Sequence, residues 1–147
     1  MNNIREHQLV AAHGALRQEV ISLLKENELP TSDIDESKIL FALTKGSYVI
    51  GTGGLEFFDD CALLRSLSVR PGWQGRGLGK IITRQLEQVC REKGVADVYL
   101  LTETAQGFFN KEGYLAINRA DAPLAIKKCS QFITVCASSG ILMHKNV

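Results

Sequence analysis

The chain has 147 residues, of which 45% are apolar and 22% are charged, and its formal net charge is +1. This length and composition suit one globular domain with a single core and argue against a disordered protein. The small net charge argues against nucleic acid or an anionic membrane as a partner held by a bulk electrostatic field. No apolar run is long enough to span a bilayer, and Arg5 and Glu6 interrupt the N-terminus, so we expect a cytoplasmic protein without a signal peptide.

The cysteines and histidines do not predict a metal site. The four cysteines are Cys61, Cys90, Cys129 and Cys136. Their spacing fits neither a zinc-binding cysteine pair nor a dense disulfide framework, and the three histidines are equally scattered. We expect reduced, mostly buried thiols and no metal cofactor.

The N-terminal part of the chain predicts a short strand at 8–12, followed by a helix. Apolar residues recur at helical spacing from Leu16 to Leu24, which indicates an amphipathic helix. Leu29-Pro30 ends this helix, because proline disfavours the helical conformation in the residue before it. The polar segment 31–36 predicts a turn that can cap a short second helix.

From residue 39 the pattern changes to that of strands. Ile39–Leu43 and Tyr48–Phe58 predict two strands joined by a tight turn at Lys45-Gly46-Ser47. Ala62–Val69 is an almost continuous apolar run, which suits a central strand covered on both faces.

Helices and strands alternate in the remaining sequence. The predicted elements are a helix from Leu78 to Cys90, a strand Val98–Leu101, a short helix Ala105–Lys111, a strand Tyr114–Asn118, a helix near Ala125–Val135 and a strand Ile141–His144. The order predicts an α/β fold in one domain spanning 1–147, with a mixed sheet and helices on both faces. It does not match the strict alternation of a doubly wound fold.

A glycine-rich loop joins the strand 62–69 to the helix that begins at Leu78. Gly75, Gly77 and Gly79 lack a Cβ atom, so the backbone can approach a ligand closely. The first amides of the following helix have no partner within the helix, and the helix dipole adds positive potential there. Arg76 and Lys80 add positive charge. The loop therefore predicts a site for phosphate oxygens.

Two common nucleotide-binding loops are excluded by residue identity. A Walker A loop ending in Gly79-Lys80 requires glycine at 74 and serine or threonine at 81, where this chain has Gln74 and Ile81. A Rossmann loop requires glycine at 80 or at 82, depending on its first glycine. These positions are Lys80 and Ile82.

The loop and its flanks resemble the GNAT superfamily of N-acetyltransferases. Gln74-x-x-Gly77-x-Gly79 matches the family's Gln/Arg-x-x-Gly-x-Gly/Ala signature. Thr102-x-x-Ala105-x-x-x-Phe109 and Lys111-x-Gly113-Tyr114 are similar to its Asn-x-x-Ala-x-x-x-Tyr and Lys-x-Gly-Phe patterns. A narrower resemblance, to small acetyltransferases associated with bacterial arsenic-resistance gene clusters, includes Leu29-Pro30-Thr31-Ser32-Asp33 and Leu63-Leu64-Arg65-Ser66-Leu67.

The resemblance implies a GNAT-type fold with a mostly antiparallel sheet, two splayed parallel strands and acetyl-CoA as cosubstrate. Leu67 and Val69 are then expected to offer backbone groups to the pantetheine arm. The other expected cofactor contacts are Gln74, Gly75, Arg76, Gly77, Gly79, Lys80 and Phe109. The implied chemistry is direct attack of a neutral amine on the thioester, aided by proximity and by backbone groups that polarise the carbonyl.

An amine nucleophile must lose a proton, and the departing thiolate is helped by gaining one. The sequence departs from the family pattern at both points. The family's acid is a tyrosine at the position of Phe109, which has no proton to give. Thr102 replaces the family's asparagine and is one catalytic candidate. Glu56 is another, as a base acting through water or as a site for an ammonium group, although it equally fits an outward-facing carboxylate. Arg65, a charge between leucines, is favoured as a site for a substrate carboxylate over a partner for Glu56.

The leading hypothesis is therefore N-acetylation of a small amine. The resemblance suggests an amino-acid-like or arsenic-containing acceptor. A non-catalytic acyl-CoA-binding or sensing domain is the alternative, because the expected acid is missing. A third hypothesis is transfer of another acyl chain, or transfer to an oxygen nucleophile. The expected partners are a small-molecule amine and a second copy in a homodimer, which is common in similar proteins.

Overall fold

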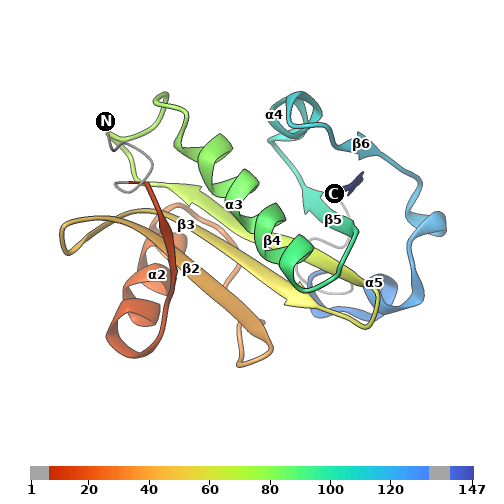
Figure 1. Cartoon of the computed structure of the whole chain (residues 1–147), viewed down its shortest axis with the longest axis horizontal. Helices are drawn as coiled ribbons and strands as arrows, with labels where there is room; N and C mark the ends of the chain where they lie inside the picture. Colours follow the sequence, from red (N-terminus) through yellow and green to blue (C-terminus); the bar gives the residue numbers. More distant parts are fainter. Residues whose placement is uncertain (1–6, 133–139) are drawn as a thin grey trace.

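The computed structural model describes residues 7–132 and 140–147, which form a seven-stranded sheet with helices on both faces (Figure 1). The strand order is β1-β2-β3-β4-β5-β7-β6. The strands are β1 (Leu9–Ala11), β2 (Lys38–Lys45), β3 (Tyr48–Phe57), β4 (Cys61–Val69), β5 (Asp97–Thr102), β6 (Leu115–Ala116) and β7 (Ile141–Asn146). Within the described sheet, β4 and β5 pair in parallel and the other neighbours pair antiparallel. This confirms the predicted mixed sheet.

The helices divide between the two faces of the sheet. They are α2 (Gly14–Glu26), α3 (Leu78–Glu92), α4 (Gln106–Lys111), the 3-10 helix η1 (Arg119–Asp121) and α5 (Leu124–Lys128). Alternation along β2 shows the division, because Phe41 and Leu43 join the core under α3 while Leu40 and Ala42 join the core under α2. Helix α5 packs on the same face as α2, with Ile126 against Leu63 and Leu101.

Two glycines of β3 let α3 approach the sheet closely. A Cβ atom added at Gly53 would lie 2.8 Å from Leu86 Cδ1 and 2.9 Å from Ile82 Cγ2, and one at Gly51 would lie 2.7 Å from Ile82 Cδ1. Leu86 and Ile82 are fully buried, so neither can move aside easily. These contacts fix how closely α3, and hence the loop before it, lies against the sheet.

Replacing Gly53 with alanine should therefore lower the free energy of unfolding by about 1–3 kcal/mol, the usual cost of overpacking a core. Gly107 in α4 is the matched control, because a Cβ atom there meets nothing within 4 Å. Gly107→Ala should be neutral or slightly stabilising. Urea denaturation of both variants checks this expectation, and equal effects would contradict the close approach of α3.

The parallel pair separates towards its C-terminal end. Cys61, Ala62 and Leu63 pair with Asp97, Val98 and Tyr99, and the pairing stops there. Beyond this point β4 stays paired with β3, while β5 stays paired with β7 through Thr102. The two central strands are thus splayed, as the family resemblance implied.

The late elements differ most from the prediction. The strand expected at Tyr114–Asn118 is only Leu115–Ala116, because the Asn118 side chain accepts a hydrogen bond from the Ala120 amide and starts η1. The helix expected at Ala125–Val135 is interrupted at Cys129, whose backbone is extended, and helical turns resume at 130–132. Its remaining residues, like Cys136, lie outside the described residues. The segment 31–36 forms turns and no helix.

Three of the four cysteines lie in the described part of the chain, and Cys61, Cys90 and Cys129 are free and buried there. Burial raises the pKa of the Cys61 and Cys90 thiols to about 11, which keeps them in the unreactive thiol form at neutral pH. Within the described ranges, no cluster of three or more His, Cys, Asp or Glu side chains is arranged to hold a metal ion. No helix in those ranges has the length and apolarity needed to cross a bilayer.

Candidate active site

A cleft of about 400 Å³ opens where β4 and β5 separate. One wall is β4 from Leu64 to Leu67, and the opposite wall runs along the end of β5 from Leu100 to Ala105. The loop after α2, residues 27–30, covers one side, while Phe109 and Gln131 complete the lining. This volume lies within the range of small-molecule binding sites.

A second hollow of about 380 Å³ lies over the N-terminus of α3. Its lining residues are Val69, Trp73, Gln74, Gly75, Gly77, Leu78, Gly79, Lys80 and Phe108. The two hollows adjoin along β4 and α4, because Leu67 and Phe109 line the cleft while Val69 and Phe108 line the second hollow. A ligand lying along β4 can therefore occupy both.

The loop adopts the backbone that its glycines permit. Gly75 and Gly77 both have a φ of +79°, and Gly77 is the residue immediately before α3. Because the first amides of a helix lack partners within it, the second hollow is lined by available N–H donors at the positive end of the α3 dipole. A Cβ atom at Gly79 would come within 3.4 Å of the Phe108 ring, so glycine keeps this hollow open.

Two loop side chains support the loop itself. Gln74 Nε2 donates to the Val69 carbonyl at 3.1 Å. Arg76 Nη2 donates to the Gly72 carbonyl at 3.3 Å, and its guanidinium lies 4.8 Å from the centre of the Trp73 ring. Arg76 does not line either hollow, whereas Lys80 lines the second. Of the two predicted loop cations, Lys80 thus lines the second hollow, and Arg76 lies over the Trp73 ring.

A β-bulge interrupts β4 on the cleft wall. Thr52 pairs with Ser68 and Gly54 pairs with Arg65, so Ser66 and Leu67 together oppose one residue of β3. Ser66 has a φ of +58°, and its carbonyl accepts a hydrogen bond from Thr52 Oγ1 at 2.8 Å. A bulge leaves backbone groups out of the ladder. Ser66 and Leu67, the two bulged residues, both line the cleft.

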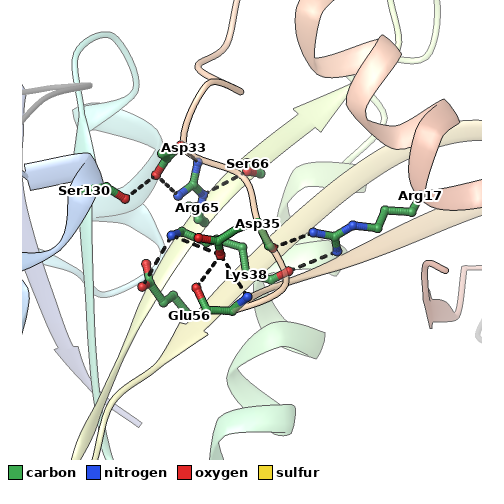
Figure 2. Close-up of polar contacts among 9 residues, drawn as sticks. Arg17, Asp33, Asp35, Lys38, Glu56, Arg65, Ser66 and Ser130 are labelled. Carbon is green, nitrogen blue, oxygen red and sulfur yellow. Dashed lines mark hydrogen bonds and ion pairs between the residues drawn. The ribbon is translucent and has the colours of Figure 1, made fainter. Parts of the chain in front are cut away.

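Arg65 lies on the cleft wall and is held by Asp33, which comes from the loop after α2 (Figure 2). Arg65 Nη1 and Nη2 donate to the two carboxylate oxygens of Asp33 at 2.5 and 2.7 Å, and Nε donates to Ser66 Oγ at 3.2 Å. Ser130 Oγ donates to Asp33 at 2.8 Å. Burial acts to raise the pKa of Asp33, but the hydrogen bonds and charge of Arg65 outweigh it and hold this pKa below its usual value.

Glu56 lies on the same face of the sheet as Arg65 and is not among the residues that line the cleft (Figure 2). Its Oε2 is 3.8 Å from Lys38 Nζ, which also lies 3.5 Å from Asp35. Its Oε1 is buried without a hydrogen-bond partner among the described residues. Burial raises the pKa of Glu56, and the nearby charges of Lys38 and Arg65 oppose the rise only in part.

Thr102 and Phe109 both line the cleft at the end of β5 and on α4. Thr102 Oγ1 accepts a hydrogen bond from the Ala105 amide at 3.0 Å, and a hydroxyl that accepts can still donate its own proton. The Phe109 ring packs edge-on against Phe108 and Tyr114, with centroids 5.0 and 5.6 Å away. The cleft lining thus includes a hydroxyl and an apolar ring close to the end of β5.

The sequence did not identify the loop after α2 as part of this site. Asn27, the C-terminal cap of α2, donates through its side-chain amide to Ser68 Oγ and to the Val69 carbonyl, which joins the loop to β4. Glu28 has a φ of +61° and also lines the cleft. The one available signal was Arg65 itself, since a buried arginine requires a carboxylate, but the sequence offers many carboxylates.

Comparison with known proteins places this geometry in a family. The family model described as Acetyltransferase (GNAT) family matches residues 4–114. An uncharacterized N-acetyltransferase from Chlorobaculum tepidum is 29% identical over 116 residues, which cover 78% of this chain and 74% of that protein.

Solved structures show the same fold. A GNAT-family acetyltransferase from Staphylococcus aureus matches with a TM-score of 0.75 at 18% identity, covering 95% of this chain and 98% of that one. N-acetylglutamate synthase from Neisseria gonorrhoeae, solved with coenzyme A and N-acetyl-glutamate, matches with a TM-score of 0.79 at 18% identity over 95% of this chain. The match spans 34% of that longer enzyme.

The fold and these matches identify the protein as an acyltransferase. The chain is a member of the Acetyltransferase (GNAT) family.

Proposed function

We propose that this acyltransferase moves the acetyl group of acetyl-CoA to the amine of a small molecule, by direct attack within a ternary complex. The observation that carries the proposal is the pair of adjoining hollows. One lies over helix amides and glycines, and the other lies between splayed strands. A nucleotide-like cosubstrate with a long arm fits this arrangement, with its reactive end in the cleft beside a second, smaller reactant.

The residues of the second hollow fit a pyrophosphate. The amides near Gly75, Gly77 and Gly79 and the ammonium of Lys80 present donors and positive charge to one open space. Leu67 and Val69 would hold the connecting arm along β4, and Phe109 would border its end. When bound, acetyl-CoA supplies the activated acetyl group.

The cleft residues act by binding and orienting the reactants. The bulge at Ser66-Leu67 offers backbone groups that can polarise a carbonyl in the cleft. Thr102, which lines the cleft at the end of β5, would hydrogen-bond a reactant through Oγ1. Phe109 excludes water but gives no proton, so the departing thiolate takes its proton from solvent or from the acceptor amine.

Glu56 is proposed to take the amine proton through water, because its Oε1 has no hydrogen-bond partner among the described residues and its raised pKa makes it a better base near neutral pH. In the wild type, the rate should then fall as the pH drops through the raised pKa and Glu56 becomes protonated. Glu56→Gln should lower kcat and remove this acidic limb. Asp35→Asn is the matched control, because Asp35 contacts the same Lys38. Rates measured against pH decide the point, and an unchanged limb in Glu56→Gln would remove Glu56 from the mechanism.

The acceptor is proposed to be a small primary amine. The resemblance to arsenic-resistance acetyltransferases adds arsenic-containing and amino-acid-like amines to the compounds worth testing. The direct test is release of free CoA from acetyl-CoA with a panel of such amines, together with mass spectrometry of the products. N-acetylated amine formed in step with CoA supports the proposal. Tight acetyl-CoA binding without turnover on any amine would instead favour a sensing domain. This alternative arises because Phe109, at the position of the family's acid, has no proton to give.

A further inference from the structure

Very few groups set the charge of the cleft in which the acceptor is proposed to bind. Among the described residues that line the cleft, those with a charged side chain are Glu28, Arg65 and Glu103. Glu28 and Glu103 are exposed at its border, and Arg65 is the one positive group of the three. The net charge of the lining that contacts an acceptor therefore depends on whether the Arg65 charge is neutralised by a partner.

The Arg65 charge is already compensated by Asp33. The two side chains are 1% and 6% exposed, and both Nη atoms of Arg65 are engaged by the Asp33 carboxylate in a two-pronged contact. Its Nε donates to Ser66, and Asp33 is further held by Ser130 on the opposite side (Figure 2). To bind Arg65, an acceptor carboxylate would have to displace the Asp33 carboxylate, which is already held in a bidentate contact. Such a displacement is unfavourable.

We infer that the acceptor carries a second positive charge and no carboxylate, and that Asp33 determines this specificity by withholding the Arg65 charge from the cleft. This inference rests on the proposed function and names its class of substrate, which excludes the amino-acid-like acceptors that the resemblance suggested. With the ion pair neutral, Glu28 and Glu103 leave the described lining negative. A second ammonium group is attracted to this border, while a carboxylate is repelled by it.

Three amines with the same four-carbon chain test the inference: putrescine ends in a second ammonium, butylamine in a methyl group and γ-aminobutyrate in a carboxylate. In the wild type, kcat/KM should fall in this order, with a difference of about tenfold or more between the first and the last. A wild type that prefers γ-aminobutyrate would overturn the inference.

Variants separate specificity from a purely structural role. Asp33→Asn keeps an acceptor for Ser130 but frees the Arg65 charge, so the ratio of kcat/KM for γ-aminobutyrate to that for putrescine should rise by about tenfold. Asp35→Asn, in the same loop but exposed, should leave the ratio unchanged. A role for Asp33 in folding alone would lower all three values equally and would overturn the inference. Glu103→Gln changes an exposed residue and should lower the preference for putrescine even if Asp33→Asn fails to fold.

The two proposals fail in different ways. If the protein acetylates other amines but does not discriminate among these three, the inference is wrong and the proposed function stands. If no amine in any panel is acetylated, the proposed function itself is wrong.

Discussion

Replacing Arg65 with alanine should lower the free energy of unfolding by about 3–5 kcal/mol, because it leaves the Asp33 carboxylate buried without its counter-charge. The two side chains are almost fully buried and meet through both carboxylate oxygens. Removing one partner of such a pair destabilises the protein more than replacing both partners with apolar residues does. The reason is that the remaining buried charge is neither paired nor solvated. Chemical denaturation at neutral pH measures the difference.

Arg84 provides the matched control. It also pairs with a carboxylate, that of Glu112 at 3.4 Å, but its side chain is 62% exposed. Arg84→Ala should therefore cost less than about 1 kcal/mol. Similar losses for the two variants would show that burial of the Arg65 pair is not what makes it important.

The Arg65 effect should also depend on pH in one direction. The pKa of Asp33 is lowered in the folded state from its ordinary value of 3.8. The stabilisation that this carboxylate gains from Arg65 is therefore fully present above that value and is lost as the pH falls through the lowered pKa. The difference in stability between wild type and Arg65→Ala should be largest at neutral pH and should shrink on acidification. A constant difference would contradict the ion-pair explanation.

The regular part of the fold could be predicted from the sequence because its signals are local. The strand at Ala62–Val69 and the helix from Leu78 have strong apolar patterns, and the structure places them at Cys61–Val69 and Leu78–Glu92. The turn at Gly46 follows from a residue that readily takes a positive φ, which is +61° here. Such features depend on residues that are near in sequence.

The region after Phe109 could not be predicted as well, because long-range contacts determine it. Ser130 hydrogen-bonds Asp33 across 97 residues, and the helix that the sequence extends through this region breaks one residue before it. Residues 114–118 carry the pattern of a strand, but Asn118 starts a 3-10 helix instead. The local apolar pattern does not indicate the Ser130–Asp33 hydrogen bond or the cap formed by Asn118, and these contacts decide the structure here.

The two halves of the site were predictable to different degrees. The loop from Gln74 to Lys80 combines glycines, two cations and a helix start in one stretch, so its residues could be named from the sequence. Most of them line one hollow in the structure. The proposed acceptor site combines Arg65 and Glu103, which line the cleft, with Asp33, which pairs with Arg65. These three residues lie far apart in the chain. Nothing in the sequence showed that Asp33 and Arg65 would meet, and this pairing changes how the charge of Arg65 is understood.

The proposed binding of acetyl-CoA depends most on the glycine loop, and Gly77→Asp tests this loop directly. The substitution puts a carboxylate and a β-carbon at a φ of +79° directly before α3, where the phosphate oxygens are proposed to bind. Acetyl-CoA affinity should fall by about a hundredfold, equivalent to about 2.7 kcal/mol. Like-charge repulsion and the lost approach to the helix amides both contribute.

Gly46→Asp is the matched control, because Gly46 also has a positive φ and open space around it but lies in the turn between β2 and β3. The two variants should lose similar stability from backbone strain, and Gly46→Asp should bind acetyl-CoA as the wild type does. The deciding measurement is the Kd of acetyl-CoA by calorimetric titration of the three folded proteins. We expect a Kd about a hundredfold higher for Gly77→Asp alone. An unchanged Kd for Gly77→Asp would contradict the assignment of this loop as the cofactor site.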